Sequence, residues 1–238
     1  VYEDREYPER SWVATGVEID VQETSSQWYP RKNFKTKCKQ GFTMTATGEH
    51  ADKVAIFEEE IPVNVFCFKA DFAESSGVHN TGMARLIDYI LRGMGFLTEA
   101  QKADPRVRTT VNGRPSVMWH QTSEDDERTS LGKYNFNNDK STNETFGFKA
   151  GCESWEILNN TSDRVLFKRS DYITVDSEGN IEWLKDFEAR YPDENEDYTN
   201  LKRLTDWLVS VKDNPTKFRA EADQYLDMNF MLSYYTIT

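Results

Sequence analysis

The sequence predicts an α+β fold, because strand-like and helix-like patterns occupy different parts of the chain. Apolar and polar residues alternate through much of the first two thirds, and one helical period interrupts them at residues 77–95. Helical periods fill the last third. No repeat of about 20–50 residues is visible, which argues against a solenoid or a propeller. We therefore expect one domain that is rich in sheet first and helical afterwards.

Alternation of apolar and polar side chains marks most of the expected strands. Residues 63–68 are instead apolar at every position but Asn64 and follow Pro62, which indicates a largely buried strand. Residues 27–30 form a corner between two strands. The single strands expected from these patterns are 12–21, 33–39, 42–47, 63–68, 131–136 and 145–148.

Two further pairs of strands are expected to be hairpins, each turned by a dipeptide that contains Asn. Asn-Gly is the strongest short-range signal of a hairpin turn. The expected pairs are 107–111 with 115–120, turned by Asn112-Gly113, and 153–158 with 164–167, turned by Asn159-Asn160.

Residues 77–95 carry apolar side chains three and four positions apart, so these side chains share one helical face. The residues on this face are Met83, Leu86, Ile87, Ile90, Leu91 and Met94. Thr98 is a capping residue for a short helix that ends before Pro105. The helices expected in the last third are 181–191, 198–211 and a segment that starts at Pro215 and continues towards the end of the chain.

The charge of the chain excludes several classes of partner. Its 238 residues include 29 Lys and Arg against 41 Asp and Glu, a formal net charge of −12. Phosphates and anionic lipids repel such a chain, so we expect neither a nucleic-acid partner nor a membrane partner. Because the first residue is Val1 and not Met, we expect a piece of a longer polypeptide that is truncated at both ends.

The cysteines predict no zinc site, because Cys38, Cys67 and Cys152 are far apart and form no CxxC pair. Free thiols in a reducing compartment are the simplest interpretation. His79 lies near Asp71 and Glu74, where an acid–base or metal site is one interpretation and a polar loop that enters a helix is the other.

Residues 132–140 are a strand that runs into a polar cluster. Asn138 and Asp139 at its end offer oxygen ligands of the kind that Mg²⁺ prefers, and an ordinary turn is the alternative interpretation. Walker A, GxGxxG and GxSxG motifs are absent from the sequence.

Three segments, in order, resemble the motifs of the spore-coat CotH kinase family. Residues 21–35 are similar to its opening signature, R-G-N-S-S-x-x-x-P-K-K-S-[FY]-[RK], although Gln22 and Glu23 replace Arg-Gly and Thr24 replaces Asn. Residues 69–86 resemble its Asp/Asn-rich stretch that opens a helix. Residues 132–138 resemble G-x-Y-x-L-x-E, with Asn138 in the place of Glu.

This resemblance implies a CotH-like atypical kinase fold, in which a twisted, mainly antiparallel sheet lobe and a helical lobe enclose nucleotide and Mg²⁺. The first residues are charged and include Pro8, which indicates a lead-in arm at 1–12. The domain fragment expected at 13–238 then has sheet-rich residues 13–170 and helical residues 177–238. Catalytic residues remain unassigned. The nucleotide-binding candidates are Lys32, Lys35 and Lys69, and the metal candidates are Asn138 and Asp139.

A more specific resemblance involves residues 69–82 and 132–140. Their sequences are similar to CotH-like segments in tail and minor structural proteins of bacteriophages. We therefore expect a structural component of a virion, made in the bacterial cytoplasm, that contacts other virion proteins in a homo- or hetero-oligomer and needs no cofactor. The alternative is an active CotH-type Ser protein kinase that uses ATP and Mg²⁺. A third interpretation is a carbohydrate- or wall-binding module that exposes Trp and Tyr.

Overall fold

The computed structural model confirms a mixed α+β chain with antiparallel sheets and several helices. The residues that it describes are 1–22, 25–73, 76–77, 79–149, 153–157, 173–175, 177–178, 181–184, 187–190 and 197–237. These residues fall into two compact units, Val1–Gly147 and Phe148–Ile237, called unit 1 and unit 2 below. A two-lobed domain also divides in this way, so the expectation of one domain stays a prediction.

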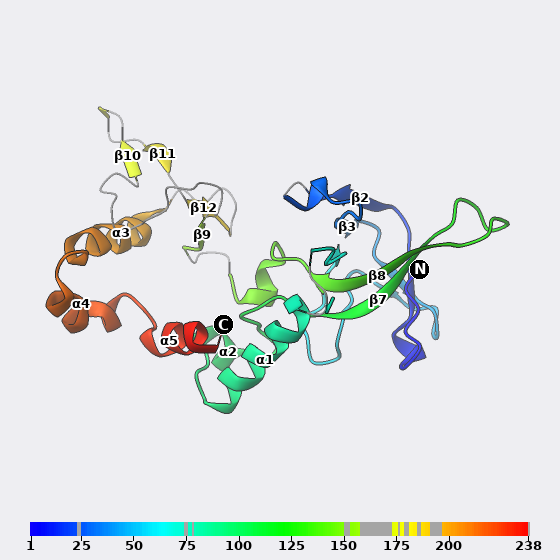
Figure 1. The fold of residues 1–238 in the computed structure, drawn as a ribbon, viewed down its shortest axis with the longest axis horizontal. Helices are drawn as coiled ribbons and strands as arrows, with labels where there is room; N and C mark the ends of the chain where they lie inside the picture. Colours follow the sequence, from blue (N-terminus) through cyan, green and yellow to red (C-terminus); the bar gives the residue numbers. More distant parts are fainter. Residues whose placement is uncertain are drawn as a thin grey trace. The chain divides into compact units, whose positions relative to one another are not determined.

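Unit 1 is built on a five-stranded antiparallel sheet with the order β2-β3-β6-β8-β7 (Figure 1). Its strands are β2 (Val17–Val21), β3 (Phe34–Cys38), β6 (Val65–Lys69), β8 (Thr129–Asn138) and β7 (Gly113–His120). The antiparallel pair β2–β3 confirms the strand–turn–strand expected around the corner at 27–30. Strands β7 and β8 pair antiparallel from Gly113 opposite Asn137 to His120 opposite Thr129, and so form a long hairpin arm.

A second, three-stranded sheet has the order β1-β4-β5, with β1 at Trp12–Ala14, β4 at Phe42–Met44 and β5 at His50–Ala51. The single strand expected at 12–21 is therefore wrong, because β1 and β2 belong to different sheets. Gly16 separates them with φ +60, a conformation that glycine adopts without a steric cost. A Cβ at this position would lie 2.7 Å from the Gln40 side chain.

The core of unit 1 is aromatic and lies on one face of the five-stranded sheet. Phe66 of β6 and Phe136 of β8 lie on neighbouring strands, with ring centroids 4.9 Å apart. Trp12, from β1, stacks on Phe66 of β6 with ring centroids 6.1 Å apart and so joins the two sheets. The buried residues of this core are Trp12, Cys38, Phe42, Val54, Ile56, Val63, Phe66 and Phe136.

The expected lead-in arm at 1–12 packs against this core. Tyr2 stacks on Trp12 with centroids 5.2 Å apart, and the short helix η1 spans Pro8–Arg10. Asp4 is buried, accepts hydrogen bonds from the N–H groups of Glu6 and Tyr7, and pairs with Arg114 at 2.5 Å. Burial alone would raise the pKa of Asp4, but these contacts outweigh it and lower the pKa.

Helix α1 (His79–Gly93) confirms the helix predicted at 77–95, but its buried face is rotated from the predicted one. The predicted face included Leu86, which is 45% exposed, so that part of the prediction is wrong. Contacts from residues 107–110 decide the rotation: Arg108 pairs with Asp88, and Thr110 donates to the Ala84 carbonyl. The buried residues of α1 are Thr81, Ala84, Ile87 and Leu91.

The hairpin predicted around Asn112-Gly113 is wrong, because residues 107–111 form no strand and β7 pairs with β8 instead. Asn112 is held by its own contacts: its N–H donates to Asn138 Oδ1 at 2.7 Å, and its side chain donates to Glu60. These bonds hold Asn112 just before β7. The chain reverses instead between β7 and β8, in the acidic residues 121–128.

Two other local predictions have opposite outcomes. The short helix α2 (Glu99–Ala103) begins as predicted at Thr98, which forms a capping box with Gln101. The strand predicted at 145–148 is wrong, because Asn143–Phe146 is the 3₁₀ helix η3. Gly147 ends this helix in the left-handed conformation, so residues 145–148 do not form an extended strand.

The described residues of unit 2 form two small antiparallel ladders and a helical segment. β9 (Trp155–Ile157) pairs with β12 (Phe187–Ala189), and β10 (Ile173–Val175) pairs with β11 (Ile181–Leu184). The helix predicted at 181–191 is therefore wrong, since β11 and β12 lie there. The partner predicted for 153–158, at 164–167, lies outside the described residues.

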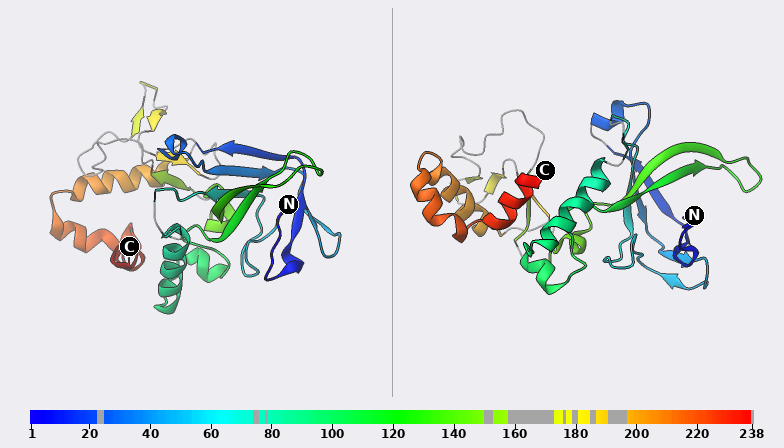
Figure 2. Two further views of the ribbon diagram at one scale, coloured as in Figure 1. Left: turned by 45° about the vertical axis from the view of Figure 1, so that its right-hand side comes forward. Right: turned by 60° about the horizontal axis from the view of Figure 1, so that its bottom comes forward.

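The helices of unit 2 are α3 (Thr199–Val211), α4 (Pro215–Glu221), η5 (Ala222–Gln224) and α5 (Met228–Ile237), drawn from orange to red in Figure 2. The helices predicted at 198–211 and from Pro215 are confirmed, although the second is divided into three pieces. Glu153 caps α3 by accepting from the N–H groups of Asn200 and Leu201 at 2.9 and 2.6 Å. Among the described residues, the helices are too short or too polar to cross a membrane.

Candidate functional site

The polar face of the five-stranded sheet carries a connected group of six side chains, called the Cys67 cluster. Its members come from four neighbouring strands or from the residues just after them, so the sheet register brings them together. Lys35 of β3 stands directly opposite Cys67 of β6, and Lys69 is two residues further along β6 on the same face. The cluster consists of Gln22, Lys35, Cys67, Lys69, Asp139 and Ser141.

Hydrogen bonds run through the cluster from one lysine to the other. Lys69 Nζ donates to Gln22 Oε1, and Gln22 Nε2 donates to Cys67 Sγ at 3.2 Å. Cys67 Sγ in turn donates to Asp139 Oδ2 at 2.8 Å. The other carboxylate oxygen, Oδ1, pairs with Lys35 Nζ at 3.1 Å and accepts from the Ser141 backbone N–H at 2.8 Å.

The surroundings shift the pKa values of the two central groups in opposite directions. Burial would raise the pKa of Asp139, but bonds from Cys67 and Ser141 and the charge of Lys35 outweigh burial and lower it to about 2. Burial and the neighbouring Asp139 carboxylate raise the pKa of the Cys67 thiol to about 12. At neutral pH the cluster therefore holds an ionised carboxylate and a protonated thiol.

The structure brings together three of the residues predicted from sequence. Lys35, Lys69 and Asp139 all belong to the Cys67 cluster, so two cations and one carboxylate share a sheet face. Lys32 lies apart from them, because its ammonium group donates to the carbonyl oxygens of Gln27 and Tyr29 and closes the corner.

Asn138 is directed to the other side of the strand from Asp139. Its Oδ1 accepts from the Asn112 N–H, and it stands opposite Phe66 of the aromatic core. Successive residues of a strand point to opposite faces, so the two metal candidates do not converge on one ion. Within the described residues, groups of three or more His, Cys, Asp or Glu arranged to hold a metal are absent.

The loop before α1, where sequence analysis placed a possible acid–base site, is held by Asp71. Its backbone has φ 44, and its carboxylate accepts from the side chains of Asn80 and Asn135. Asn135 and Lys133 also donate to the Gly77 carbonyl. These contacts favour the interpretation of a polar loop that enters a helix, and Glu74 lies outside the described residues.

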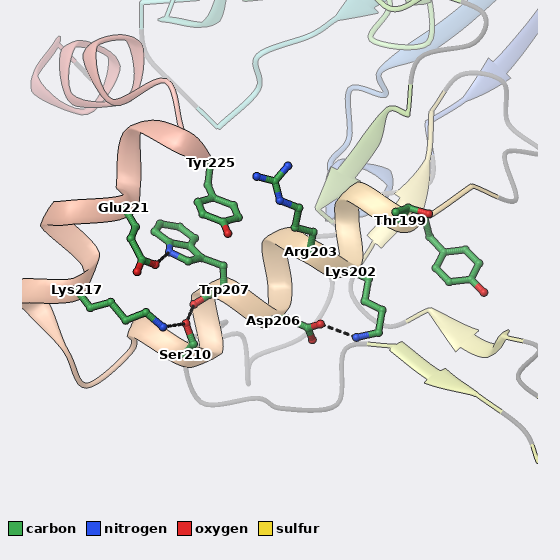
Figure 3. Close-up of a pocket in the computed structure, with 10 residues that line it drawn as sticks. Thr199, Lys202, Arg203, Asp206, Trp207, Ser210, Lys217, Glu221 and Tyr225 are labelled. Atoms are coloured by element: carbon green, nitrogen blue, oxygen red, sulfur yellow. Dashed lines mark hydrogen bonds and ion pairs between the residues drawn. The ribbon is translucent and has the colours of Figure 1, made fainter.

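A groove of about 570 Å³ lies along α3 and α4 of unit 2 (Figure 3). Trp207 stacks on Tyr225 with centroids 4.4 Å apart, and the Arg203 guanidinium lies 4.9 Å from the centroid of Tyr225. Glu221 accepts from the Trp207 indole N–H at 3.0 Å. Figure 3 shows the Tyr225 ring between Trp207 and Arg203, so both faces of this ring meet protein groups and neither is open for a sugar to stack on.

A comparison with models of protein families, with curated proteins and with solved structures found no match for this chain. The site therefore has to be interpreted from its own chemistry. Sequence analysis missed Gln22, Cys67 and Ser141 as members of the cluster. One sequence signal pointed to Cys67. It lies two residues before Lys69 in a predicted strand, so the two side chains are expected on the same face of the sheet.

Proposed function

We propose that this chain is a structural component of a bacteriophage virion, in the tail or associated with it, built on a CotH-kinase-like fold. It acts by its shape and by contacts with other virion proteins, in a homo- or hetero-oligomer, and without a cofactor. The observation that carries the proposal is that each candidate residue for binding nucleotide or metal is already held by a contact within the protein.

The arrangement of the three family-like segments supports the CotH-like part of this proposal. The first segment runs from the last residue of β2 to the first residues of β3, the second runs from the end of β6 into α1, and the third lies on β8. Lys35, Lys69 and Asp139, which come from or directly follow these segments, meet in the Cys67 cluster. Segments that are far apart in sequence thus supply one site, as a shared family fold would require.

The contacts of the candidate residues support the structural part. Lys32 closes a turn, Lys35 neutralises Asp139, and Lys69 donates to Gln22. Phosphoryl transfer needs a cation placed on the phosphates and carboxylates placed on the metal. Asn138 and Asp139 point to opposite faces of β8, so they do not fit one Mg²⁺ ion together, and we derive no transfer step through that metal.

The Lys35–Asp139 pair favours the second candidate function, an active CotH-type Ser protein kinase. A cation and an ionised carboxylate 3.1 Å apart, with Lys69 on the same sheet face, form part of a phosphate-binding constellation. In this function ATP would displace the contacts within the protein, and Mg²⁺ would take Asp139 with ligands other than Asn138.

Two assays on the 238-residue chain separate the functions. We expect calorimetric titration with ATP and Mg²⁺ to give no heat of binding, and radiolabelled phosphate transfer to the chain or to casein to be absent. Transfer that disappears in Lys69→Ala but persists in the matched surface variant Lys32→Ala would contradict the structural function. Binding without transfer would indicate a relic nucleotide site.

The structural function also has a direct test. Tryptic peptides of this chain should appear in mass spectra of density-purified phage particles, in a constant ratio to a known tail protein. Cross-linking of those particles should join the chain to other virion proteins. Its absence from intact particles, together with abundance in the infected cell, would contradict the proposal.

A further inference from the structure

The Gln22 carboxamide lies between a thiol and an amine. Its nitrogen is 3.2 Å from Cys67 Sγ, and its oxygen accepts from Lys69 Nζ. Cys67 is 3% exposed, and its thiol proton is directed to the Asp139 carboxylate at 2.8 Å. A nucleophile, a base and a group that polarises the carbonyl thus surround one amide.

We propose that Gln22 and Lys69 become joined by an isopeptide bond, formed through an internal thioester between Gln22 and Cys67. The reaction uses only these side chains and the proton acceptor Asp139. It would link the end of β2 covalently to β6 across the intervening strand β3. The inference goes beyond the proposed function and stands independently of it, because it rests on the contacts of the cluster alone.

The first step forms the thioester. Asp139 takes the proton from Cys67 as Sγ attacks the Cδ carbon of Gln22, and Lys69 stabilises the negative charge that develops on Oε1. The carbon–nitrogen bond then breaks. The departing nitrogen takes the proton from Asp139, so that ammonia leaves and the carboxylate is restored.

The second step forms the isopeptide bond. The Lys69 ammonium gives a proton to the released ammonia, which departs as ammonium ion. The neutral Lys69 Nζ attacks the thioester carbonyl, the carbon–sulfur bond breaks, and Sγ takes the remaining amine proton. In sum, one ammonium side chain and one carboxamide become an amide and free ammonium, and the Cys67 thiol is regenerated.

The surroundings suit a slow reaction that occurs once per chain. Attack requires the Gln22 carboxamide to turn from its hydrogen bond with Cys67 until its carbon faces Sγ. Groups oriented in this way react with effective molarities of about 10⁵–10⁸ M, which favours attack on an otherwise unreactive amide. The raised pKa of Cys67 keeps the thiol protonated at rest, and the lowered pKa of Asp139 makes the carboxylate a weak base, so the proton transfer that accompanies the attack is uphill and the reaction is slow. Lys35 and Ser141 hold Asp139 in place for this transfer.

Intact-mass spectrometry of the purified 238-residue chain tests the proposal directly. We expect the wild-type mass to be lower than the sequence mass by one ammonia, with the fraction rising during incubation. Tandem spectra should then show residues 11–31 joined to residues 54–85, because trypsin does not cleave after a modified Lys69. A wild-type chain that keeps its full mass, and whose Gln22 and Lys69 peptides are separate, would overturn the proposal.

A matched pair of cysteine variants assigns the nucleophile. Cys67→Ala should keep the full mass, whereas Cys38→Ala, an equally buried cysteine on the other face of the sheet, should lose ammonia as the wild type does. A succinimide at Asn112-Gly113 would also remove ammonia, but it would do so in both variants. Cross-linking of Gln22 to Lys69 in Cys67→Ala would overturn the role of the thiol.

The variant Lys69→Arg tests the thioester, because Arg keeps the positive charge at Oε1 without a nucleophilic amine. This variant should still lose ammonia, and added methylamine should attach to Gln22 and free the thiol for alkylation. A full mass in Lys69→Arg, beside a cross-linked wild type, would overturn the thioester step and indicate direct attack by the amine.

Discussion

The two faces of the five-stranded sheet in unit 1 share the same strands but are held by different forces. One face is an aromatic core, where Phe66 and Phe136 are 1% and 2% exposed. The other face carries the Cys67 cluster, where Cys67 and Asp139 are nearly as buried at 3% and 5%. Burial alone does not distinguish them, and the difference lies in how each face compensates for the loss of water.

The aromatic face gains free energy from every ring that leaves water and from close contacts, so it tolerates changes that keep volume. The polar face gains little from burial, and each of its groups depends on a particular partner. Residues on the first face therefore contribute mainly to stability. Residues on the second are placed with the precision that binding or covalent chemistry requires.

The largest expected effect is on the aromatic face. Phe66→Ala should lower the free energy of unfolding by about 3–5 kcal/mol, from lost burial and from the cavity that remains. The matched control is Val117→Ala on the same sheet, which is 58% exposed and should change stability by less than about 0.5 kcal/mol. Urea denaturation of both variants measures the difference, and equal midpoints would contradict the assignment of the core face.

On the polar face, Asp139→Asn should destabilise the protein by about 1–3 kcal/mol, because Lys35 loses its anionic partner and one of the two acceptor oxygens becomes an NH₂ donor. The cost stays below that of a fully buried pair because the Lys35 side chain is 38% exposed and can be hydrated. Glu18→Gln breaks the Glu18–Lys39 pair on the same sheet, whose side chains are about half exposed, and should cost at most about 1 kcal/mol. A larger cost for Glu18→Gln than for Asp139→Asn would contradict the comparison.

The pH dependence of stability sharpens the same comparison. The folded-state pKa of Asp139 is about 2, below the ordinary value of 3.8, so its ionised form stabilises the fold above about pH 4. That contribution, at most about 2 kcal/mol, is lost as the pH falls from about 4 towards 2. The wild-type minus Asp139→Asn difference in urea midpoint should shrink over this range, and a constant difference would show that the carboxylate is not selectively stabilised.

The smallest expected effect concerns α1. Leu86→Ala should cost less than about 1 kcal/mol, because Leu86 is 45% exposed. Ile87→Ala, at the next position and 4% exposed, should cost about 2–4 kcal/mol. Reversed costs for these two neighbours in urea denaturation would restore the helical face expected from the sequence.

Local sequence patterns correctly predicted several elements that are stabilised by residues close to them along the chain. The alternation at 33–39 gave β3, the helical spacing of leucines gave α3, and Thr98 with Gln101 gave the capping box of α2. The Asn112-Gly113 turn failed for a long-range reason. Asn112 is held by Asn138 and Glu60, residues that a local turn signal does not include.

The candidate site shows the same limit. The sequence indicated Lys35, Lys69 and Asp139 by their residue types and by their place in family-like segments. It could not indicate that Gln22 and Cys67, which lie 45 residues apart, meet, because they do so only when β2, β3 and β6 pair in register.

The sequence by itself determined the strand at 33–39 and the helices at 77–95 and 198–211, because a regular period decides which side chains share a face. The periods read at 12–21 and 181–191 did not determine the structure there. It also determined the net charge of −12, from which we expect neither a nucleic-acid partner nor a membrane partner. The tertiary structure alone decided which strands pair, which face of α1 is buried, and that a glutamine amide lies between a thiol and an amine. Strand pairing and register join residues that are distant along the chain, and no local pattern encodes those distances.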